Sequence, residues 1–331
     1  MEKESAEKRR VCVTGAGGFI ASWLVKLLLS KGYMVHGTVR DPSDEKNAHL
    51  KNLDGALENL QLFKADLLDY NAVAAAIAGC EGVFHVASPV PPTKVLNPEV
   101  ELLAPAVEGT LIVLKVCSEV KVKRVIVVSS VVSVLMNPKW PKDKVMDEEC
   151  WSDSEYCRTT ENWYCLSKTI AETEALEYAR KHELDVVTVC PSMVLGPLLQ
   201  SKVNSSSLFL INILKGNPES MENRSLHYVD VRDVADSLLL VYEKPEASGR
   251  YVCAPHPLKM LDLVNMLKEK FPVYEYPKKF IEVEDRPLMS SEKLKRLGWK
   301  VRPLKETLVD TVECYEKAGL LNTGITSDLY I

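Results

Sequence analysis

The chain has 331 residues, of which 46% are hydrophobic, 26% charged and 7% aromatic. This composition is typical of a globular protein and excludes disordered, fibrous and disulfide-scaffold chains. The 41 Lys and Arg residues against 46 Asp and Glu residues give a net charge of −5, so no general basic surface is available for a phosphate backbone and we expect no nucleic-acid partner.

Cysteine usage and apolar patterning predict the cellular compartment. The nine cysteines include no CxxC pair, and most of them lie inside apolar runs, which is typical of a reducing environment. The charged start, MEKESAEKRR, lacks the apolar segment of a signal peptide, and no apolar run reaches the length of about 18 residues that spans a bilayer. We therefore expect a cytoplasmic protein without a membrane span.

Short apolar runs alternate with longer helical patterns through the first 190 residues. The predicted strands are residues 10–14, 34–39, 60–64, 83–86, 125–128 and 185–190. Their nearly continuous apolar character is typical of parallel strands that are buried on both faces. Helical stretches at 20–31, 102–117 and 162–181 are long enough for crossover connections. The pattern predicts an α/β fold with a Rossmann-type, doubly wound parallel sheet.

After residue 190 prolines interrupt the helical patches, which indicates a smaller substrate-binding lobe. The apolar stretch 233–242 and the run 250–254 have the pattern of a helix and a strand that return to the large domain. We therefore predict a discontinuous division. Residues 1–190 with about 229–254 form the cofactor-binding domain, and about 191–228 with 255–331 form the substrate lobe.

The first strand leads through a glycine-rich turn directly into a helix. Glycines let the backbone turn tightly, so that a pyrophosphate can approach the unpaired N–H groups at the helix N-terminus. The third position of this G-x-x-G-x-x-A pattern is Ala21, which allows close packing of the helix on the strand. The predicted pyrophosphate-binding residues are Gly15, Gly17, Gly18, Phe19 and Ile20.

The end of the second strand indicates which dinucleotide binds. An NAD enzyme usually places an acid there, but this chain has Arg40, with Lys46 six residues later. Because a guanidinium can hold a 2′-phosphate through paired, charge-assisted hydrogen bonds, the sequence predicts NADP(H). By analogy of position, we expect residues after the third and fourth strands near the adenine and the ribose, namely Asp66, Leu67, Ala87 and Ser88.

Tyr164 and Lys168 are four residues apart in a helical stretch, so they share one face. Ser129 and Ser130 end the fifth strand at the carboxyl edge of the sheet, where ligands bind in such folds. Reduction of a carbonyl leaves negative charge on its oxygen, which requires a proton donor and a hydrogen-bond donor. We predict that Tyr164 donates the proton, Ser130 binds the oxygen with help from Ser129, and Lys168 lowers the pKa of the phenol and contacts the ribose.

These motifs carry a family resemblance. The segment TGAGGFIASW, the Tyr164–Lys168 pair and residues 228–233 (YVDVRD) resemble the extended short-chain dehydrogenase/reductases over nearly the whole chain. Residues 162–165 (NWYC), 191–200 and 247–251 are similar to the plant cinnamoyl-CoA reductase group. The resemblance implies NADP(H) as cofactor and a phenylpropanoid carbonyl as substrate. It places Pro191, Met193 and Val194 by the cofactor and, as candidate substrate contacts, Met136, Phe209, Asn212 and Tyr228, with Met193 and Val194 also candidates for the aromatic pocket.

Departures from the family pattern bear on the substrate. Dihydroflavonol reductases carry an Asn five positions after the catalytic serine, where this chain has Leu135. Cinnamoyl-CoA reductases have a His and a Lys where this chain has Phe209 and Asn212, so two expected CoA contacts are missing. Lys202, Lys215 and Arg250 are the cations that could replace them. We therefore predict reduction of hydroxycinnamaldehydes such as coniferaldehyde to alcohols. Reduction of a cinnamoyl-CoA thioester and of a dihydroflavonol or polyketide-type ketone are the alternatives.

Other candidate features fit simpler roles. Cys157 and Cys165 flank the NWYC segment, and we expect two unpaired thiols there rather than a redox-sensitive disulfide. His85 and His227 are expected to be packing or surface residues and not catalysts, and no His/Cys/Asp cluster has the spacing of a metal site. A sensor that binds NADP(H) without catalysis remains a remote alternative, because such a protein would have no need for Ser130, Tyr164 and Lys168 together. The sequence leaves the oligomeric state open.

Overall fold

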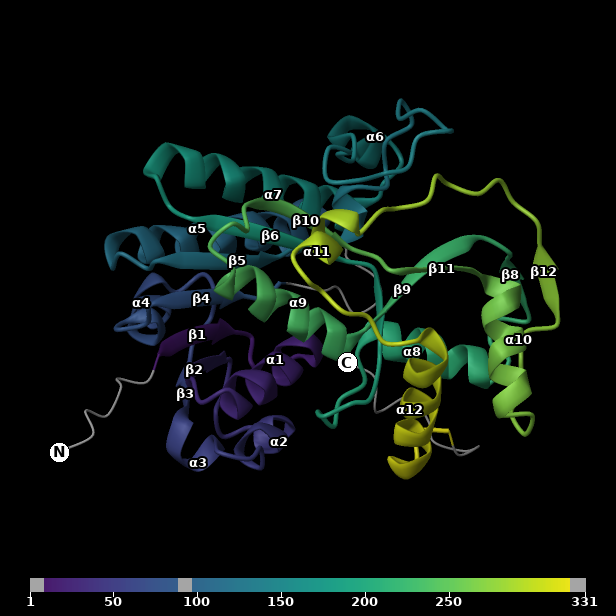
Figure 1. Cartoon of the computed structure of the whole chain (residues 1–331), viewed down its shortest axis with the longest axis horizontal. Helices are drawn as coiled ribbons and strands as arrows, with labels where there is room; N and C mark the ends of the chain where they lie inside the picture. The colour runs from purple at the N-terminus through teal and green to yellow at the C-terminus, as the bar shows by residue number, and fades with distance from the viewer. Residues whose placement is uncertain (1–8, 89–96, 322–331) are drawn as a thin grey trace.

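A seven-stranded parallel sheet forms the centre of the computed structural model, which describes residues 9–88 and 97–321 (Figure 1). The strand order is β10-β6-β5-β4-β1-β2-β3. The strands are β1 (Arg10–Thr14), β2 (Met34–Val39), β3 (Leu60–Lys64), β4 (Gly82–His85), β5 (Arg124–Val128), β6 (Val186–Pro191) and β10 (Gly249–Cys253). The six strands predicted in the first 190 residues each end within one residue of an observed strand, and the predicted doubly wound α/β fold is confirmed.

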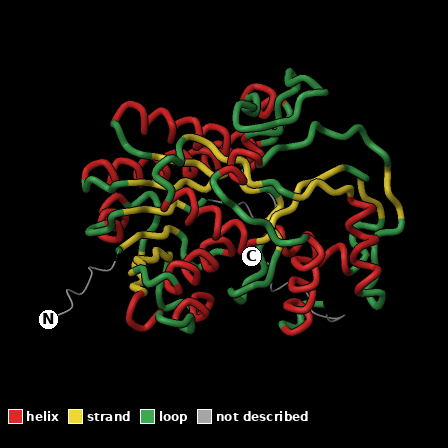
Figure 2. Tube along the Cα trace, viewed as in Figure 1, coloured by secondary structure: helices red, strands yellow, loops and turns green. Residues whose placement is uncertain are grey.

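Helices pack on both faces of this sheet (Figure 2). The long ones are α1 (Phe19–Ser30), α4 (Tyr70–Ile77), α5 (Ala104–Glu119), α7 (Trp163–His182) and α9 (Val231–Glu243). Helices α1 and α9 pack against each other on one face, and α4, α5 and α7 cover the other. The shorter connecting elements are η1 (Glu45–Asn47), α2 (Ala48–Lys51), α3 (Ala56–Asn59), η2 (Glu99–Leu103, a π-helix), η3 (Val131–Ser133) and α6 (Ser154–Thr159).

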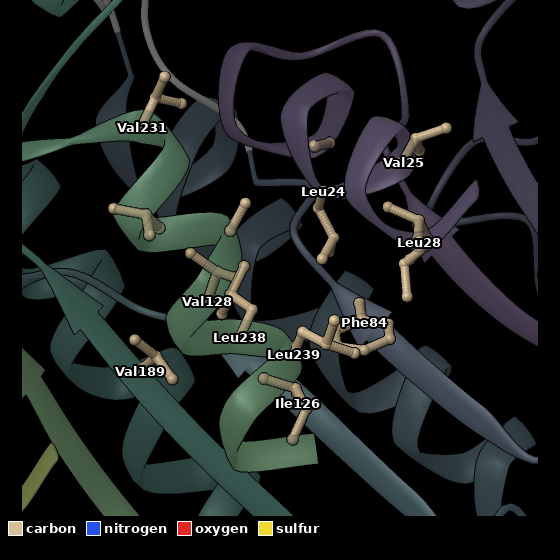
Figure 3. Packing of buried hydrophobic residues seen from close by; sticks show 14 of the residues in the cluster. Leu24, Val25, Leu28, Phe84, Ile126, Val128, Val189, Val231, Leu238 and Leu239 are labelled. Carbon is tan, nitrogen blue, oxygen red and sulfur yellow. The ribbon is translucent and has the colours of Figure 1, made fainter. Parts of the chain in front are cut away.

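Strand β5 shows why buried parallel strands have continuous apolar sequences. Ile126 and Val128 point toward α1 and α9, where they join a buried cluster with Leu24, Leu238 and other residues (Figure 3). The intervening residues, Val125 and Val127, belong to the cluster formed with α4, α5 and α7. Because side chains alternate across a strand, both sets must be apolar for the sheet to be buried on both sides.

A smaller lobe lies beside the large sheet. It contains a three-stranded sheet in the order β11-β9-β7 and a two-stranded sheet of β12 and β8. Its elements are β7 (Met193–Leu195), α8 (Ser205–Leu214), β8 (Ser220–Glu222), β9 (Ser225–Asp230), β11 (His256–Lys259), α10 (Met260–Lys270), β12 (Lys279–Ile281) and α12 (Leu304–Lys317). Residues of β7, β9, α8, α10 and α12 share one apolar cluster.

The chain leaves the lobe and returns to the large sheet through α9 and β10, which correspond to the predicted helix 233–242 and strand 250–254. The exact division into two lobes stays a prediction. Helix α11 (Glu292–Arg296), which that division assigns to the substrate lobe, contacts β10, and its Leu294 belongs to the same core as α1 and α9. Within residues 9–88 and 97–321, no helix is long and apolar enough to cross a bilayer.

Candidate active site

The glycine turn after β1 has the backbone geometry that close approach of a ligand requires. Gly15 has a φ of +66°, and a Cβ there would lie 2.9 Å from the Cβ of Ala87. At Gly17 a Cβ would collide with the side chain of Asn47. Gly18 is the N-cap of α1 and no side chain caps this helix, so its first N–H groups point to the turn without a capping partner. The predicted residues therefore form a cradle that fits a pyrophosphate.

Next to this turn, a cavity of about 340 Å³ is lined by Arg40, Lys64, Ala65, Asp66, Asp69 and Ala72. Arg40 is exposed, and no ion pair involves it in the part of the chain that the structure describes. Lys46 differs, because its Nζ lies 2.6 Å from Oδ2 of Asp44. Arg40 thus offers an uncompensated charge at the predicted 2′-phosphate position, whereas the charge of Lys46 is shared with a carboxylate.

The residues predicted near the adenine and the ribose occupy different environments. Asp66 lines the large cavity and accepts the N–H of Leu68 at 2.9 Å, whereas Leu67 packs against Gly109 of α5. Ala87 and Ser88 line a second, smaller cavity next to Lys168. Leu67 therefore supports the wall of the site by packing.

A chain of hydrogen bonds fixes the carboxyl ends of β1 and β4. His85 Nδ1 lies 3.0 Å from Oγ1 of Thr14, and its Nε2 lies 3.1 Å from Oγ1 of Thr110. The hydroxyl of Thr110 donates to the carbonyl of Ala106, so His85 must donate through Nε2 and accept through Nδ1. Burial, with a smaller effect of the Lys168 charge, lowers the pKa of His85 to about 3. A neutral, fully bonded histidine is the packing residue that we expected.

The predicted catalytic residues meet at the carboxyl end of β5. Ser130 follows this strand, and its side chain lies close enough to the phenol of Tyr164 on α7 to lower the pKa of that phenol. Lys168 lies one helical turn further along α7 and is only 8% exposed, with its Nζ 3.4 Å from the carbonyl oxygen of Val128. The three side chains thus surround one end of the strand, next to the glycine turn.

The pKa values of Tyr164 and Lys168 differ from those expected from the sequence. We expected the Lys168 charge to lower the pKa of the phenol, but burial raises the pKa of Tyr164 to about 12, and the nearby Ser130 side chain only partly opposes this effect. Burial also lowers the pKa of Lys168 to about 8, against the attraction of Glu172. In the protein alone, desolvation outweighs the influence of the neighbouring charge.

Ser129 is directed away from its predicted role. Its hydroxyl donates to Oε2 of Glu172 at 2.7 Å, so it does not share the task of Ser130. Glu172 also forms a buried ion pair with Arg250, whose Nε lies 2.8 Å from Oε1. Arg250 is therefore not available to bind CoA. Sequence reasoning missed Glu172, although its position four residues after Lys168 places it on the catalytic face of α7.

The residues predicted to contact substrate are spread over two environments. Tyr228 is fully buried, pairs with Met193 between β9 and β7, and belongs to the core of the lobe, so it is not a surface for substrate. Met136 is also buried, in a cluster with Cys157, Cys165 and Leu166. Both cysteines are free thiols.

The other predicted contacts lie at the end of β6, on β7 and on α8. Pro191 ends β6, and Val194 is buried in the same cluster as α1 and α9. Met193 is half-buried on β7 and packs on the core of the lobe. Phe209 and Asn212 are half-buried on α8, and Phe209 also packs on the core of the lobe.

Known proteins share this architecture and sequence. Residues 11–254 match the NAD dependent epimerase/dehydratase family. Cinnamoyl-CoA reductase 1 of Petunia hybrida is 48% identical over 315 residues, which cover 94% of this chain and 93% of that protein. Vestitone reductase from alfalfa (Medicago sativa) is 34% identical, with a TM-score of 0.82 and coverage of 94% of this chain and 99% of that one.

A third similar protein was solved with a cofactor. Yeast methylglyoxal/isovaleraldehyde reductase Gre2, in complex with NADPH, is 29% identical with a TM-score of 0.82, and the match covers 94% of this chain and 99% of that one. The family match covers more than half of the chain, and the similarity to the petunia enzyme extends over nearly all of it. The chain therefore belongs to the NAD dependent epimerase/dehydratase family, as an extended short-chain dehydrogenase/reductase of the plant cinnamoyl-CoA reductase and dihydroflavonol reductase group, and is a nicotinamide-dependent oxidoreductase.

Proposed function

We propose that this protein uses NADPH to reduce a hydroxycinnamoyl carbonyl, and that its main substrate is the CoA thioester, which it converts to the aldehyde. The observation that carries the reductase assignment is the grouping of Ser130, Tyr164 and Lys168 at the carboxyl end of β5, with Lys168 Nζ 3.4 Å from the carbonyl oxygen of Val128. The similarity to a cinnamoyl-CoA reductase over nearly the whole chain supports the thioester. This order reverses our expectation from the sequence, which favoured the aldehyde.

The cofactor is NADP(H), held by residues of this chain at both ends. The glycine cradle and the uncapped N-terminus of α1 bind the pyrophosphate, and Arg40 binds the 2′-phosphate. Lys168 contacts the nicotinamide ribose. When bound, NADPH supplies the hydride that the carbonyl carbon accepts.

Tyr164 provides the proton for the carbonyl oxygen. Its raised pKa of about 12 keeps the phenol protonated at neutral pH, which is the form that a proton donor needs. Ser130, which lies beside Tyr164, donates to the same oxygen and fixes its position. Once the phenol has released its proton, the ammonium of Lys168 stabilises the phenolate.

A thioester requires a second stage in the same site. Hydride and proton addition give a thiohemiacetal, whose C–S bond then breaks. Tyr164, now a phenolate, takes back the hydroxyl proton as the carbonyl forms again, and the CoA thiol leaves after protonation by solvent. One NADPH is consumed, and the products are the aldehyde and free CoA.

Reduction of the aldehyde to the alcohol is the second candidate, and helix α8 favours it. Phe209 and Asn212 stand where the resemblance to thioester-reducing cinnamoyl-CoA reductases implies a His and a Lys, and Arg250 is buried in its ion pair with Glu172. Two missing charge-assisted contacts at about 1.5–3 kcal/mol each correspond to a loss of CoA affinity of two to four orders of magnitude.

The test compares NADPH oxidation with feruloyl-CoA and with coniferaldehyde at equal concentrations, with identification of the products. Faster thioester turnover, with aldehyde and free CoA as products, is the result expected. Faster coniferaldehyde turnover would assign the enzyme to alcohol formation. The double substitution Phe209→His with Asn212→Lys should then increase thioester turnover relative to aldehyde turnover. Lys202→Gln, which removes a different cation of the lobe, serves as the control variant.

We also propose a cytosolic location and a small-molecule phenylpropanoid carbonyl as the partner. Nine cysteines without a paired framework are typical of a reducing compartment, and all nine are free thiols in the structure.

A further inference from the structure

A buried carboxylate lies beneath the catalytic lysine. Glu172 is 1% exposed, and its carboxylate accepts three short hydrogen bonds of 2.6–2.7 Å in addition to the ion pair with Arg250. The donors are the hydroxyls of Ser129, Ser133 and Thr188. Removing a carboxylate from water is strongly unfavourable unless its lone pairs are satisfied, and here they are.

Arg250 is fixed as firmly as its partner. It is 5% exposed, its Nη1 donates to the carbonyls of Glu148 and Cys150 at 3.0 Å, and its guanidinium lies 3.4 Å from the ring centroid of Trp151. Burial alone would raise the pKa of Glu172, but the Arg250 charge and the hydrogen bonds hold that pKa below its ordinary value. The carboxylate is therefore ionised throughout the working range of an enzyme.

Glu172 faces Lys168 from the next turn of α7. Both side chains line a cavity of about 20 Å³, together with residues of β4, β5 and α5. This volume is sufficient for one water molecule with polar partners. The attraction of Glu172 opposes the effect of burial on the pKa of Lys168.

The other titratable groups around Lys168 are neutral near pH 7. Tyr164 on α7 has a pKa of about 12, and His85 on β4 has a pKa of about 3. The thiol of Cys190 on β6 is buried, and its pKa is raised far above neutrality. The charges in this group are thus those of Lys168, Glu172 and Arg250, in a row in which only the central charge is negative.

We propose that Glu172, held ionised by Arg250, is a positioning residue that keeps the buried Lys168 protonated and therefore able to stabilise the Tyr164 phenolate. The inference rests on the proposed reductase function, because Lys168 acts there through its charge. Without the carboxylate, burial would act unopposed and the lysine would become neutral closer to physiological pH. Arg250 determines the strength of the effect, because it prevents Glu172 from taking up a proton.

The test measures kcat/KM for NADPH-dependent reduction from pH 5 to pH 10. In Glu172→Gln, loss of a negative charge should move the alkaline limb of the profile to lower pH by roughly 1 to 3 units. In Arg250→Gln, burial would no longer be opposed by the Arg250 charge, so Glu172 should take up a proton more readily and the same limb should also move to lower pH. The double variant should have the limb of Glu172→Gln, because the carboxylate through which Arg250 acts is absent from both. Glu172→Asp, which keeps the charge, should preserve the wild-type limb.

A purely structural role for the pair predicts a different outcome. Each single variant would then lower activity equally at every pH, without displacement of the limb to lower pH, and that result would overturn the inference. The titration of Lys168 followed by NMR of 13C-labelled lysine, assigned with Lys168→Met, gives the same answer without a substrate. Unchanged lysine titration in both single variants would likewise refute the coupling, whereas a wild-type protein inactive on all carbonyls would refute the proposed function alone.

Discussion

Two substitutions in the loop after β2 should change the affinity for NADPH in opposite directions. Arg40 is exposed and has no ion pair among the described residues, whereas Lys46 is paired with Asp44 at 2.6 Å. Arg40→Gln removes the free charge from the proposed 2′-phosphate site. Asp44→Asn removes the carboxylate that competes with this phosphate for Lys46. We expect the first change to weaken NADPH binding and the second to strengthen it.

The magnitudes follow from the exposure of the groups. Loss of the charge-assisted hydrogen bonds of Arg40 should reduce the free energy of NADPH binding by about 1.5–3 kcal/mol, or roughly 10- to 150-fold in Kd. The pair of Lys46 with Asp44 is partly exposed, and such pairs are worth about 0.2–1 kcal/mol, so Asp44→Asn should lower Kd by no more than about five-fold. Asp44 also caps η1 through the N–H of Lys46, and Asn preserves this cap.

The assay is a fluorescence titration with NADPH and, in parallel, with NADH, which lacks the 2′-phosphate. Both substitutions should leave the Kd of NADH nearly unchanged, and the NADPH effects should shrink at high salt because the groups are exposed. Equal weakening of NADPH and NADH in Arg40→Gln would show that Arg40 supports the loop and does not read the 2′-phosphate. Weaker NADPH binding in Asp44→Asn would refute the competition between Asp44 and the cofactor.

Three further results are expected. Tyr164→Phe should lower turnover by roughly 10²- to 10⁴-fold while NADPH still binds. Tyr228→Phe should leave turnover unchanged, because the hydroxyl of Tyr228 is buried without a partner in the described structure. A measurable loss of turnover in Tyr228→Phe would place Tyr228 at the site. The rate of reduction should fall above about pH 8, as Lys168 loses its proton, and a profile flat to pH 10 would contradict this ionisation. Gly15→Ala should destabilise the protein by about 1–3 kcal/mol in thermal unfolding, because of the positive φ and the nearby Ala87, and an unchanged melting temperature would refute the strain.

The strands of the large sheet were predictable because the sequence of each buried strand shows its own apolar pattern. A parallel strand buried on both faces must be apolar at consecutive positions, so β1, β5 and β6 could be bounded from their apolar sequences. That Tyr164 and Lys168 share one face of α7 was predictable for a similar reason, because the two residues lie one helical turn apart. The small lobe was harder to predict, because its short strands are separated by prolines and pair only across long stretches of chain.

Pairing between distant residues could not be predicted in the same way. Arg250 and Glu172 are 78 residues apart in the chain, and nothing in the sequence of either segment specifies the other as its partner. Asp41 and Asp44 both lie close to Lys46 in the chain, but the sequence alone does not tell which of the two forms an ion pair with it. In the structure Asp41 accepts from Ser43, which leaves Asp44 for the lysine.

Two adjacent serines at the end of β5 have different partners, and the sequence does not reveal which serine contacts which partner. Ser129 and Ser130 are equally good donors, but successive side chains point to opposite sides of the backbone. Ser130 therefore reaches Tyr164 while Ser129 reaches Glu172. One serine belongs to the proposed reaction and the other to its buried support.

The spacing of residues along α7 connects the proposed reaction with its buried support. Tyr164, Lys168 and Glu172 follow each other at intervals of four residues, so they form a row along one face of the helix, from the half-buried phenol to the fully buried carboxylate. In the proposed reaction Tyr164, at the outer end of this row, exchanges a proton with the substrate, whereas Glu172, at the inner end, keeps its negative charge. Arg250, which comes from β10 after the chain has left and re-entered the large sheet, satisfies the second condition. The crossing of the chain between the lobes thus completes the electrostatic support of the helix that carries the proposed proton donor.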